Sequence, residues 1–294
     1  MVLDGGLATE LEAQGHDLTS DLWSARLLAE EPAAIVAAHT AFFAAGARVA
    51  VTSSYQASFD GLAAAGLDRS GAEALLRRSV TLADQARQQT GDPERRWVAA
   101  SVGPYGAALA DGSEYHGRYG LSVAELRAWH RPRLEVLAAA GADVLACETV
   151  PCLAEAEALL LEVQRLEVPA WLSLTCVGDR TRAGEPVAEA FALARDVRGL
   201  VAVGVNCTDP ADADGLVTLA AEVSGLPVVV YPNSGEAWDA GARAWSGDSQ
   251  FHPEQVSRWT RAGARLVGGC CRVSPADIAA LATTVTDPTG GDGR

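Results

Sequence analysis

Short apolar runs alternate along the chain with longer segments whose apolar residues recur at intervals of three and four. The short runs are rich in valine and alanine, and most of them end in glycine, proline, asparagine or serine, which is typical of buried strands that end in a turn. We therefore expect eight strands, at residues 2–6, 47–55, 96–104, 142–150, 169–177, 200–207, 226–234 and 264–271.

The segments between these runs have the periodicity of amphipathic helices, as in residues 32–43 and 153–163. Strict alternation of strand and helix favours a parallel sheet whose strands are connected by crossover helices. Eight such units in one chain predict an α/β fold of the closed (β/α)8 TIM-barrel type. A doubly wound open sheet has the same local pattern and is the alternative.

No linker or low-complexity stretch divides the chain, so we expect a single domain. The barrel is predicted to span residues 1–285, followed by a polar C-terminal tail at 286–294. The longest loops are predicted at 103–122 and 233–250, and the second of these contains Trp238 and Trp245.

The formal charge of −15 argues against binding to nucleic acid, which requires a basic surface to replace counterions. No stretch reaches the roughly 18 uninterrupted apolar residues of a membrane span, and the chain starts without a basic, apolar leader. We therefore expect a cytoplasmic protein that binds neither membranes nor nucleic acid. Every basic residue is an arginine. Because lysine is absent, enzymes that depend on a lysine Schiff base are excluded.

Six cysteines are too few for a disulfide scaffold in a chain of 294 residues, so free thiols or metal ligands are expected. Cys207 ends the sixth predicted strand, and Cys270 and Cys271 end the eighth. Side chains at the carboxyl ends of alternate barrel strands point into the same layer, so these three thiols can converge. Three thiolates with one open position are typical of a catalytic zinc site. The remaining three cysteines are predicted to be inert core residues: Cys147, Cys152 and Cys176.

A zinc ion with three thiolate ligands carries a net negative charge and is a poor activator of water. It is better suited to binding the thiol of a substrate as a fourth ligand and holding that thiol deprotonated. A free thiol with a pKa of about 8.5 is mostly protonated at pH 7. The predicted chemistry is therefore alkylation of a substrate thiol.

Seven motifs in one order carry a resemblance to a known family. They are Leu3–Leu11, Thr52–Ser58, Ser101–Gly106, Glu148–Pro151, Gly204–Cys207, Tyr231–Glu236 and Gly268–Cys271. With these motifs the chain resembles the zinc-dependent homocysteine S-methyltransferases, which are (β/α)8 proteins that methylate homocysteine to methionine. The resemblance covers nearly the whole chain.

The resemblance implies that Cys207, Cys270 and Cys271 bind Zn²⁺. It also implies that four residues hold the amino-acid end of homocysteine, with the Glu148 carboxylate pairing its ammonium group and backbone N–H groups binding its carboxylate. These residues are Asp4, Gly5, Gly6 and Glu148. An alternative for Glu148 is an ordinary surface acid near a helix start, and an alternative for Asp4 is a cap of the first loop.

Other polar and aromatic residues are candidates for the same site. Asn206, Tyr231 and Asn233 lie at strand ends, where they can order the zinc ligands or the methyl donor, or simply satisfy buried backbone groups. Tyr55, Trp238 and Trp245 can face a cationic methyl donor, because onium groups are attracted to aromatic faces. Covering the edge of the core is the alternative role for the tryptophans.

The expected reaction is an in-line transfer of a methyl group from a sulfonium donor to the homocysteine thiolate. The short single-domain form most resembles the users of S-methylmethionine or S-adenosylmethionine. A betaine-type donor or another thiol acceptor is the nearest alternative. A non-enzymatic thiol or zinc sensor, and a phosphate-binding barrel enzyme using the Gly268–Gly269 and Ser274 segment, explain fewer residues. The sequence does not indicate which oligomeric state the protein has.

Overall fold

The computed structural model describes residues 1–18, 23–239 and 244–286. Its helices are α1 (Leu7–Ala13), α2 (Trp23–Glu30), α3 (Pro32–Ala44), α4 (Phe59–Ala64), α5 (Arg69–Gln88), α6 (Tyr105–Leu109), α7 (Val123–Ala138), α8 (Leu153–Leu166), α9 (Val187–Leu193), α10 (Pro210–Ser224), α11 (Gln255–Ala262) and α12 (Pro275–Thr286), with the 3-10 turns η1 (Pro93–Arg95) and η2 (Ser113–Tyr115). Its strands are β1 (Val49–Val51), β2 (Trp97–Val102), β3 (Val144–Val150), β4 (Ala170–Leu174), β5 (Cys176–Val177), β6 (Arg180–Thr181), β7 (Leu200–Asn206), β8 (Val228–Tyr231), β9 (Ala237–Asp239), β10 (Ala244–Ser246) and β11 (Ala264–Val267).

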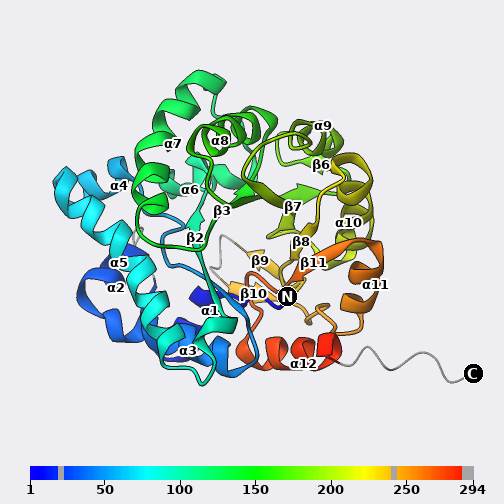
Figure 1. Ribbon diagram of the computed structural model, residues 1–294, viewed down its shortest axis with the longest axis horizontal. Helices are drawn as coiled ribbons and strands as arrows, with labels where there is room; N and C mark the ends of the chain where they lie inside the picture. Colours follow the sequence, from blue (N-terminus) through cyan, green and yellow to red (C-terminus); the bar gives the residue numbers. More distant parts are fainter. Residues whose placement is uncertain (19–22, 240–243, 287–294) are drawn as a thin grey trace, which may run out of the picture.

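Seven parallel strands form one curved sheet in the order β1-β2-β3-β4-β7-β8-β11, surrounded by helices (Figure 1). The N-terminal segment completes the ring, since Val2 bridges to Val267 of β11 and Leu3 bridges to Val49 of β1. The N–H of Leu3 donates to Val267 O at 2.8 Å, and the N–H of Asp4 donates to Val49 O at 3.0 Å. All eight predicted strand segments therefore contribute to one barrel, which confirms the (β/α)8 prediction.

A small apolar cluster fills the inside of the barrel. The strands contribute mostly small residues to it, such as Ala99, Ala146 and Ala202, which leave room for the fully buried indole ring of Trp171. The indole N–H donates to Tyr231 Oη at 3.0 Å, so the largest side chain of this cluster has its polar atom satisfied. The filled interior closes the barrel below the strand ends, as expected for a packed core rather than a pore.

A larger apolar core lies between the sheet and the helices, and it includes valines of the strands and leucines of α5, α7 and α8. The helices predicted at 32–43 and 153–163 are confirmed as α3 and α8. The last helix, α12, begins with a capping box. Ser274 Oγ accepts the N–H of Asp277, and Asp277 Oδ2 accepts the N–H of Ser274. Among the described residues, no helix combines the length and apolar character needed to cross a membrane.

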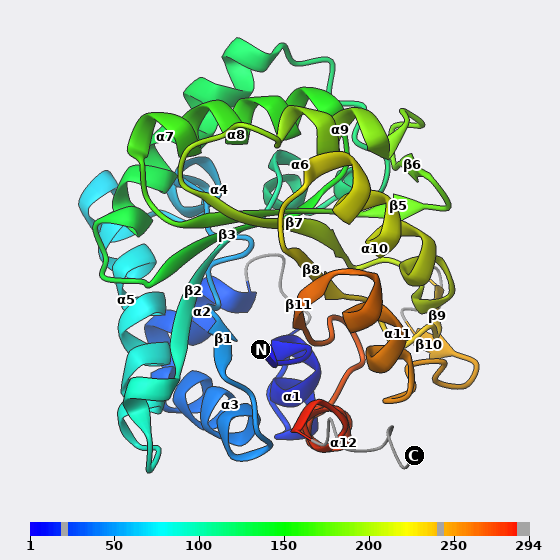
Figure 2. The same cartoon turned by 45° about the vertical axis from the view of Figure 1, so that its right-hand side comes forward.

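Two short hairpins extend from the carboxyl ends of the strands, β5–β6 after β4 and β9–β10 after β8 (Figure 2). The sequence periodicity does not predict them, because β5 falls at the end of the strand expected at 169–177 and β9 and β10 fall within the loop expected at 233–250. Strands of two or three residues carry too few positions for an alternating pattern. The predicted polar tail, 286–294, lies outside the described residues except for Thr286, which ends α12.

Glu162 of α8 holds the outer helical layer together through three arginines. Its buried carboxylate accepts hydrogen bonds from Arg127 and Arg131 of α7 and from Arg165 of its own helix. Burial alone would raise the pKa of Glu162, but the bonds from Arg131, Arg165 and Arg127 outweigh it and lower the pKa from 4.5 to about 2. Because the folded pKa is the lower one, this stabilisation is complete above about pH 4.5 and is lost as the pH falls toward 2.

We expect Glu162→Gln to lower the free energy of unfolding at pH 7 by about 2 kcal/mol. Hydrogen bonds to charged groups contribute about 1.5–3 kcal/mol each, but the three guanidinium groups remain accessible to water, which limits the total loss. Chemical denaturation between pH 7 and pH 3 should show the difference from the parent chain shrinking below pH 4.5. Glu157→Gln, at an exposed position of the same helix, is the control and should change little. A difference that is independent of pH would contradict the assignment of the shift to Glu162.

Candidate active site

Three thiols meet at the carboxyl ends of the barrel strands. Cys207 Sγ lies 2.6 Å from Cys270 Sγ and 3.8 Å from Cys271 Sγ, and the three sulfur atoms all lie within 4.8 Å of one another. Within the described part of the chain, this is the one group of three or more histidine, cysteine or acidic residues whose arrangement could hold a metal ion. The structure thus brings together the three residues that the strand-end pattern singled out.

The backbone around these cysteines departs from regular strand geometry. Cys207 follows the last residue of β7 and has a φ of +47°, and its carbonyl oxygen accepts a hydrogen bond from Thr175 Oγ1 at 3.0 Å. β11 ends at Val267, so Cys270 and Cys271 lie in the following loop rather than in the strand. The vicinal pair can therefore turn both thiols toward Cys207.

The glycines before the vicinal pair are required by close packing rather than by unusual backbone angles. A Cβ at Gly268 would lie 2.7 Å from Leu3 Cβ, and a Cβ at Gly269 would collide with the Val273 side chain. Their N–H groups donate to Val230 O and to Asp4 O. These donors, and Ser274 in its capping box, are thus engaged within the chain, so this segment offers little to a phosphate group.

The donor set suits a thiophilic cation. Hydrogen bonds from Cys207 and Cys270 lower the pKa of Cys271, whereas the interactions with Cys207 and Cys271, together with burial, raise the pKa of Cys270. The pKa of Cys207 is raised as well, so all three sulfur atoms can act as thiolate ligands together only when a cation lies between them. A tetrahedral ion with sulfur ligands at about 2.3 Å sets its ligands about 3.8 Å apart. The Cys207–Cys271 separation already has this value, and the Cys207–Cys270 pair has to widen.

The other three cysteines take no part in this cluster. Cys147, Cys152 and Cys176 are buried, which confirms their prediction as core residues. Burial raises the pKa of each of these thiols to about 12, so they stay protonated at neutral pH. Protonated thiols are poor nucleophiles and poor metal ligands.

The thiol cluster opens into a cavity of about 630 Å³, a size typical of small-molecule sites. Seven of the eight predicted substrate-binding residues line it together with the thiols. They are Asp4, Gly5, Gly6, Tyr55, Glu148, Tyr231 and Asn233.

Glu148 is a buried acid at the wall of the cavity. It is only 6% exposed, and its carboxylate accepts a hydrogen bond from Ser101 Oγ and another from Tyr231 Oη, the latter at 3.0 Å. Burial raises its pKa from 4.5 to about 7, although the bonds from Ser101 and Tyr231 act in the opposite direction. A buried carboxylate without a cationic partner is a strong acceptor for an ammonium group that enters the cavity.

The N-terminal Asp4–Gly6 segment forms another wall of the cavity. Asp4 is buried, and its Oδ2 accepts the N–H of Val51 at 2.8 Å, so this side chain also joins two barrel strands. Burial raises the pKa of Asp4 well above its usual range. The N–H of Gly6 donates to Val273 O, and a Cβ there would lie only 2.6 Å from Cys270 O. Gly6 thus lets the thiol-bearing loop pack closely on the first strand.

Asn206 is the predicted site residue that does not line the cavity. Its side chain is fully buried, and Oδ1 accepts hydrogen bonds from the Thr149 N–H at 2.7 Å and from Ser173 Oγ at 2.6 Å. Thr149 has a φ of +59°, an uncommon conformation for a β-branched residue. Asn206 therefore holds the backbone next to Glu148, which is a supporting position rather than a point of contact with the cavity.

Tyr231, Asn233 and Tyr55 also line the cavity. The hydroxyl of Tyr231 accepts from Trp171 and donates to Glu148, which links the barrel interior to the site. Asn233 Oδ1 accepts the N–H of Cys271 at 3.2 Å, so it orders the loop of the vicinal thiols. The side chains of Trp238 and Trp245, candidates either for facing the methyl donor or for covering the edge of the core, lie outside the described residues, although their backbones pair in β9–β10.

Comparison with known proteins agrees with this geometry. A family model described as homocysteine S-methyltransferase matches residues 1–285. The chain belongs to this family. It is 43% identical to homocysteine S-methyltransferase YbgG of Bacillus subtilis (strain 168) over 96% of the chain and 93% of that protein, and 45% identical to homocysteine S-methyltransferase of Escherichia coli (strain K12) over 96% and 94%. The crystal structure of the metallated form of the homocysteine methyltransferase MmuM from Escherichia coli superimposes with a TM-score of 0.87 at 43% identity, covering 96% of this chain and 95% of that one.

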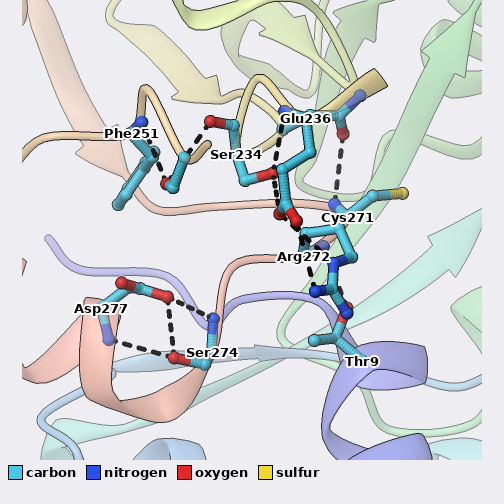
Figure 3. A network of polar contacts seen from close by, with 10 residues as sticks. Thr9, Ser234, Glu236, Phe251, Cys271, Arg272, Ser274 and Asp277 are labelled. Carbon is cyan, nitrogen blue, oxygen red and sulfur yellow. Dashed lines mark hydrogen bonds and ion pairs between the residues drawn. The ribbon is translucent and has the colours of Figure 1, made fainter. Parts of the chain in front are cut away.

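Several residues of this homocysteine S-methyltransferase family site carried no signal in the sequence. An ion pair between Glu236 and Arg272, with Ser234 bonded to Glu236, lies beside the thiol loop, and Cys271 Sγ points away from it (Figure 3). Arg182 and Tyr115 also line the cavity. Ser234 and Glu236 belong to the motif Tyr231–Glu236 but were not singled out for a role. Tyr115, Arg182 and Arg272 lie outside the motifs, so nothing in the sequence marks them.

Proposed function

We propose that the chain transfers a methyl group from a sulfonium donor to the thiol of homocysteine, giving methionine. The convergence of Cys207, Cys270 and Cys271 at the wall of a cavity that also contains Glu148 is the observation that supports this function most directly. Membership in the homocysteine S-methyltransferase family agrees with it.

We propose Zn²⁺ as the metal, held by Cys207, Cys270 and Cys271. Zinc is preferred over harder cations because all three ligands are thiolates, and three protein ligands leave one position for a substrate. When bound, zinc lowers the pKa of a coordinated thiol and so supplies the substrate sulfur as a thiolate near neutral pH.

The protein groups bind and orient the two substrates. Glu148, held in place by Ser101 and Tyr231, pairs with the ammonium group of homocysteine. The backbone N–H of Gly5 receives its carboxylate, because the N–H groups of Asp4 and Gly6 already donate to Val49 O and Val273 O. The thiolate sulfur then forms a bond to the methyl carbon of the donor in line with the bond that breaks, and the bonding electrons leave with the donor sulfur, which becomes a neutral thioether. The proton of the thiol passes to water when the thiolate forms. No protein nucleophile is needed, because the substrate sulfur itself attacks the methyl carbon.

The donor is proposed to be S-methylmethionine or S-adenosylmethionine. Tyr55 and Tyr115 line the cavity, and their rings attract an onium group. Glu12 adds negative charge to the same walls, whereas Glu236 is paired with Arg272. The free state of all six cysteines agrees with a reducing compartment, and we propose the cytoplasm.

A competition assay tests this function. The zinc-loaded chain should form methionine from homocysteine with S-methylmethionine or S-adenosylmethionine offered together with betaine, and one of the sulfonium donors should be consumed at least tenfold faster than betaine. Isotopic labelling of the methyl group in each donor identifies its source by mass spectrometry. Absence of labelled methionine with every donor, in a preparation that contains about one zinc per chain, would refute the function. A preference for betaine would refute only the donor class.

A further inference from the structure

Arg182 lies at the cavity in a position that the family motifs do not cover. It follows the β5–β6 hairpin, and its neighbours fix the backbone, since the Thr181 N–H donates to Glu185 O at 2.8 Å and the Ala183 N–H donates to Pro151 O at 3.1 Å. The side chain of Arg182 turns toward the thiol cluster, where Nη2 donates to Cys207 O at 3.4 Å. A guanidinium group is therefore held next to a metal-ligand residue by a well-anchored loop.

The guanidinium group has neutral partners only. Nε donates to Thr175 Oγ1 at 3.1 Å, and the group lies 5.8 Å from the centre of the Tyr115 ring. Arg182 forms no ion pair with any of the described residues, whereas the nearby Arg272 is neutralised by Glu236. A half-buried arginine without a carboxylate partner is suited to binding the carboxylate of a ligand.

The charges on the cavity walls point to the same kind of ligand. Of the described residues that line the cavity, Arg182 is the one with a cationic side chain, and the acidic ones are Asp4, Glu12, Glu148 and Glu236. This distribution fits ligands that carry positive centres together with a carboxylate. Homocysteine and the proposed sulfonium donors both carry an ammonium group and a carboxylate. The position of Arg182 therefore has to decide which of the two substrates it binds.

Arg182 is half-buried and lies on a more exposed side of the cavity than the proposed ammonium site of homocysteine, which is buried. Glu148 is 6% exposed and is held by Ser101 and Tyr231, whose hydroxyl also contacts the barrel interior. Tyr115, the ring beside Arg182, is 49% exposed. Homocysteine has to occupy the buried position beside Glu148 and the thiol cluster at once, which leaves the more exposed side of the cavity, with Arg182 and Tyr115, to the second substrate.

We infer that Arg182 binds the carboxylate of the methyl donor and thereby selects onium donors that carry a carboxylate. This inference rests on the proposed function, since it assigns a residue to the donor of that reaction. Arg182 is therefore a specificity-determining residue. Its hydrogen bonds to Thr175 Oγ1 and Cys207 O fix the guanidinium group in position before the donor binds. A bidentate guanidinium–carboxylate pair at this half-buried position favours the carboxylate-bearing ligand by about 10–100-fold.

The test compares S-methylmethionine with its decarboxylated analogue, (3-aminopropyl)dimethylsulfonium, on the zinc-loaded full chain. For the parent chain we expect kcat/KM at saturating homocysteine to favour S-methylmethionine by about 10–100-fold. In Arg182→Gln this preference should fall below about threefold, while the KM for homocysteine stays within about twofold. Arg182→Lys should keep part of the preference, because it keeps the charge and loses the fork. Arg180→Gln, on the same hairpin but exposed, is the matched control.

Titration calorimetry of both sulfonium compounds provides a readout that needs no turnover. An equal loss for both compounds in Arg182→Gln, or no change for either, would overturn the inference. A rise in the KM for homocysteine with an unchanged KM for the donor would assign the guanidinium to the acceptor and overturn it as well. If the parent chain binds S-methylmethionine with the expected preference but makes no methionine, the proposed function fails and the carboxylate site stands. If it makes methionine without the preference, only the inference fails.

Discussion

Cys207→Ala is expected to abolish metal binding and to reduce methionine formation by about 10³-fold or more. The substitution leaves two thiols, Cys270 and Cys271, on one loop, and two ligands cannot enclose a tetrahedral ion with a single open position. The proposed zinc content should fall from about one ion per chain to near zero. Elemental analysis of the purified protein and a homocysteine-dependent turnover assay measure the two effects.

Cys176→Ala is the matched control for this experiment. Cys176 is equally buried but does not belong to the thiol cluster, so its replacement should cost about 1 kcal/mol of stability and leave metal content and turnover intact. Circular dichroism separates a folding defect from a metal defect in both variants. A Cys207→Ala protein that is folded and still holds stoichiometric zinc would contradict the three-thiol site. If metal is lost while turnover persists, the metal does not activate the substrate.

The barrel and the thiol cluster were predictable because both follow from chain-local patterns. Each strand appears as a short apolar run, and the parallel alternation with helices places every strand's carboxyl end at one face of the barrel. Cys207 and the Cys270–Cys271 pair come at the ends of two such runs, so their convergence required no knowledge of side-chain conformations. The structure adds that the vicinal pair lies beyond β11, in a loop that packs tightly against the N-terminal segment.

The partners of Glu148 were not predictable in the same way. Ser101 lies on β2 and Tyr231 on β8, and their contact with Glu148 depends on the stagger of strands around the ring. Asn206 was a candidate for ordering the zinc ligands or the donor, with satisfying buried backbone groups as the alternative. The structure shows the alternative, because the Asn206 side chain accepts the Thr149 N–H. Arg182 depends on a hairpin of two-residue strands, which leaves no periodic signal at all.

One chain of hydrogen bonds connects the interior of the barrel to the candidate active site. The buried Trp171 donates to Tyr231, and the Tyr231 hydroxyl donates to Glu148, so a residue of the barrel interior positions the acid that we assign to the substrate ammonium. A change in packing at Trp171 is therefore transmitted to the site without any direct contact with a ligand.

Glu148→Gln is expected to reduce kcat/KM for homocysteine by about 10²–10³-fold, mainly through a higher KM. The amide keeps the shape of the side chain and can still accept a hydrogen bond from Ser101 or Tyr231, but it cannot pair with an ammonium group. Losing one partner of a buried ion pair costs about 3–5 kcal/mol, and about 1.4 kcal/mol corresponds to tenfold. Tyr231→Phe removes one hydrogen bond to the carboxylate and keeps the charge, so it should cost about tenfold or less.

The pH dependence of methionine binding separates the charge of Glu148 from its shape. Methionine has the ammonium group of homocysteine but no thiol to ionise. Because burial raises the pKa of Glu148 to about 7, the carboxylate becomes protonated as the pH falls through this value and its affinity for an ammonium group declines. We therefore expect the Kd for methionine to be constant above about pH 8 and to rise by up to tenfold per pH unit below 7. In Glu148→Gln the Kd should be higher and flat over the same range, as measured by titration calorimetry. A parent profile without this rise, or a variant that retains it, would show that another group binds the ammonium.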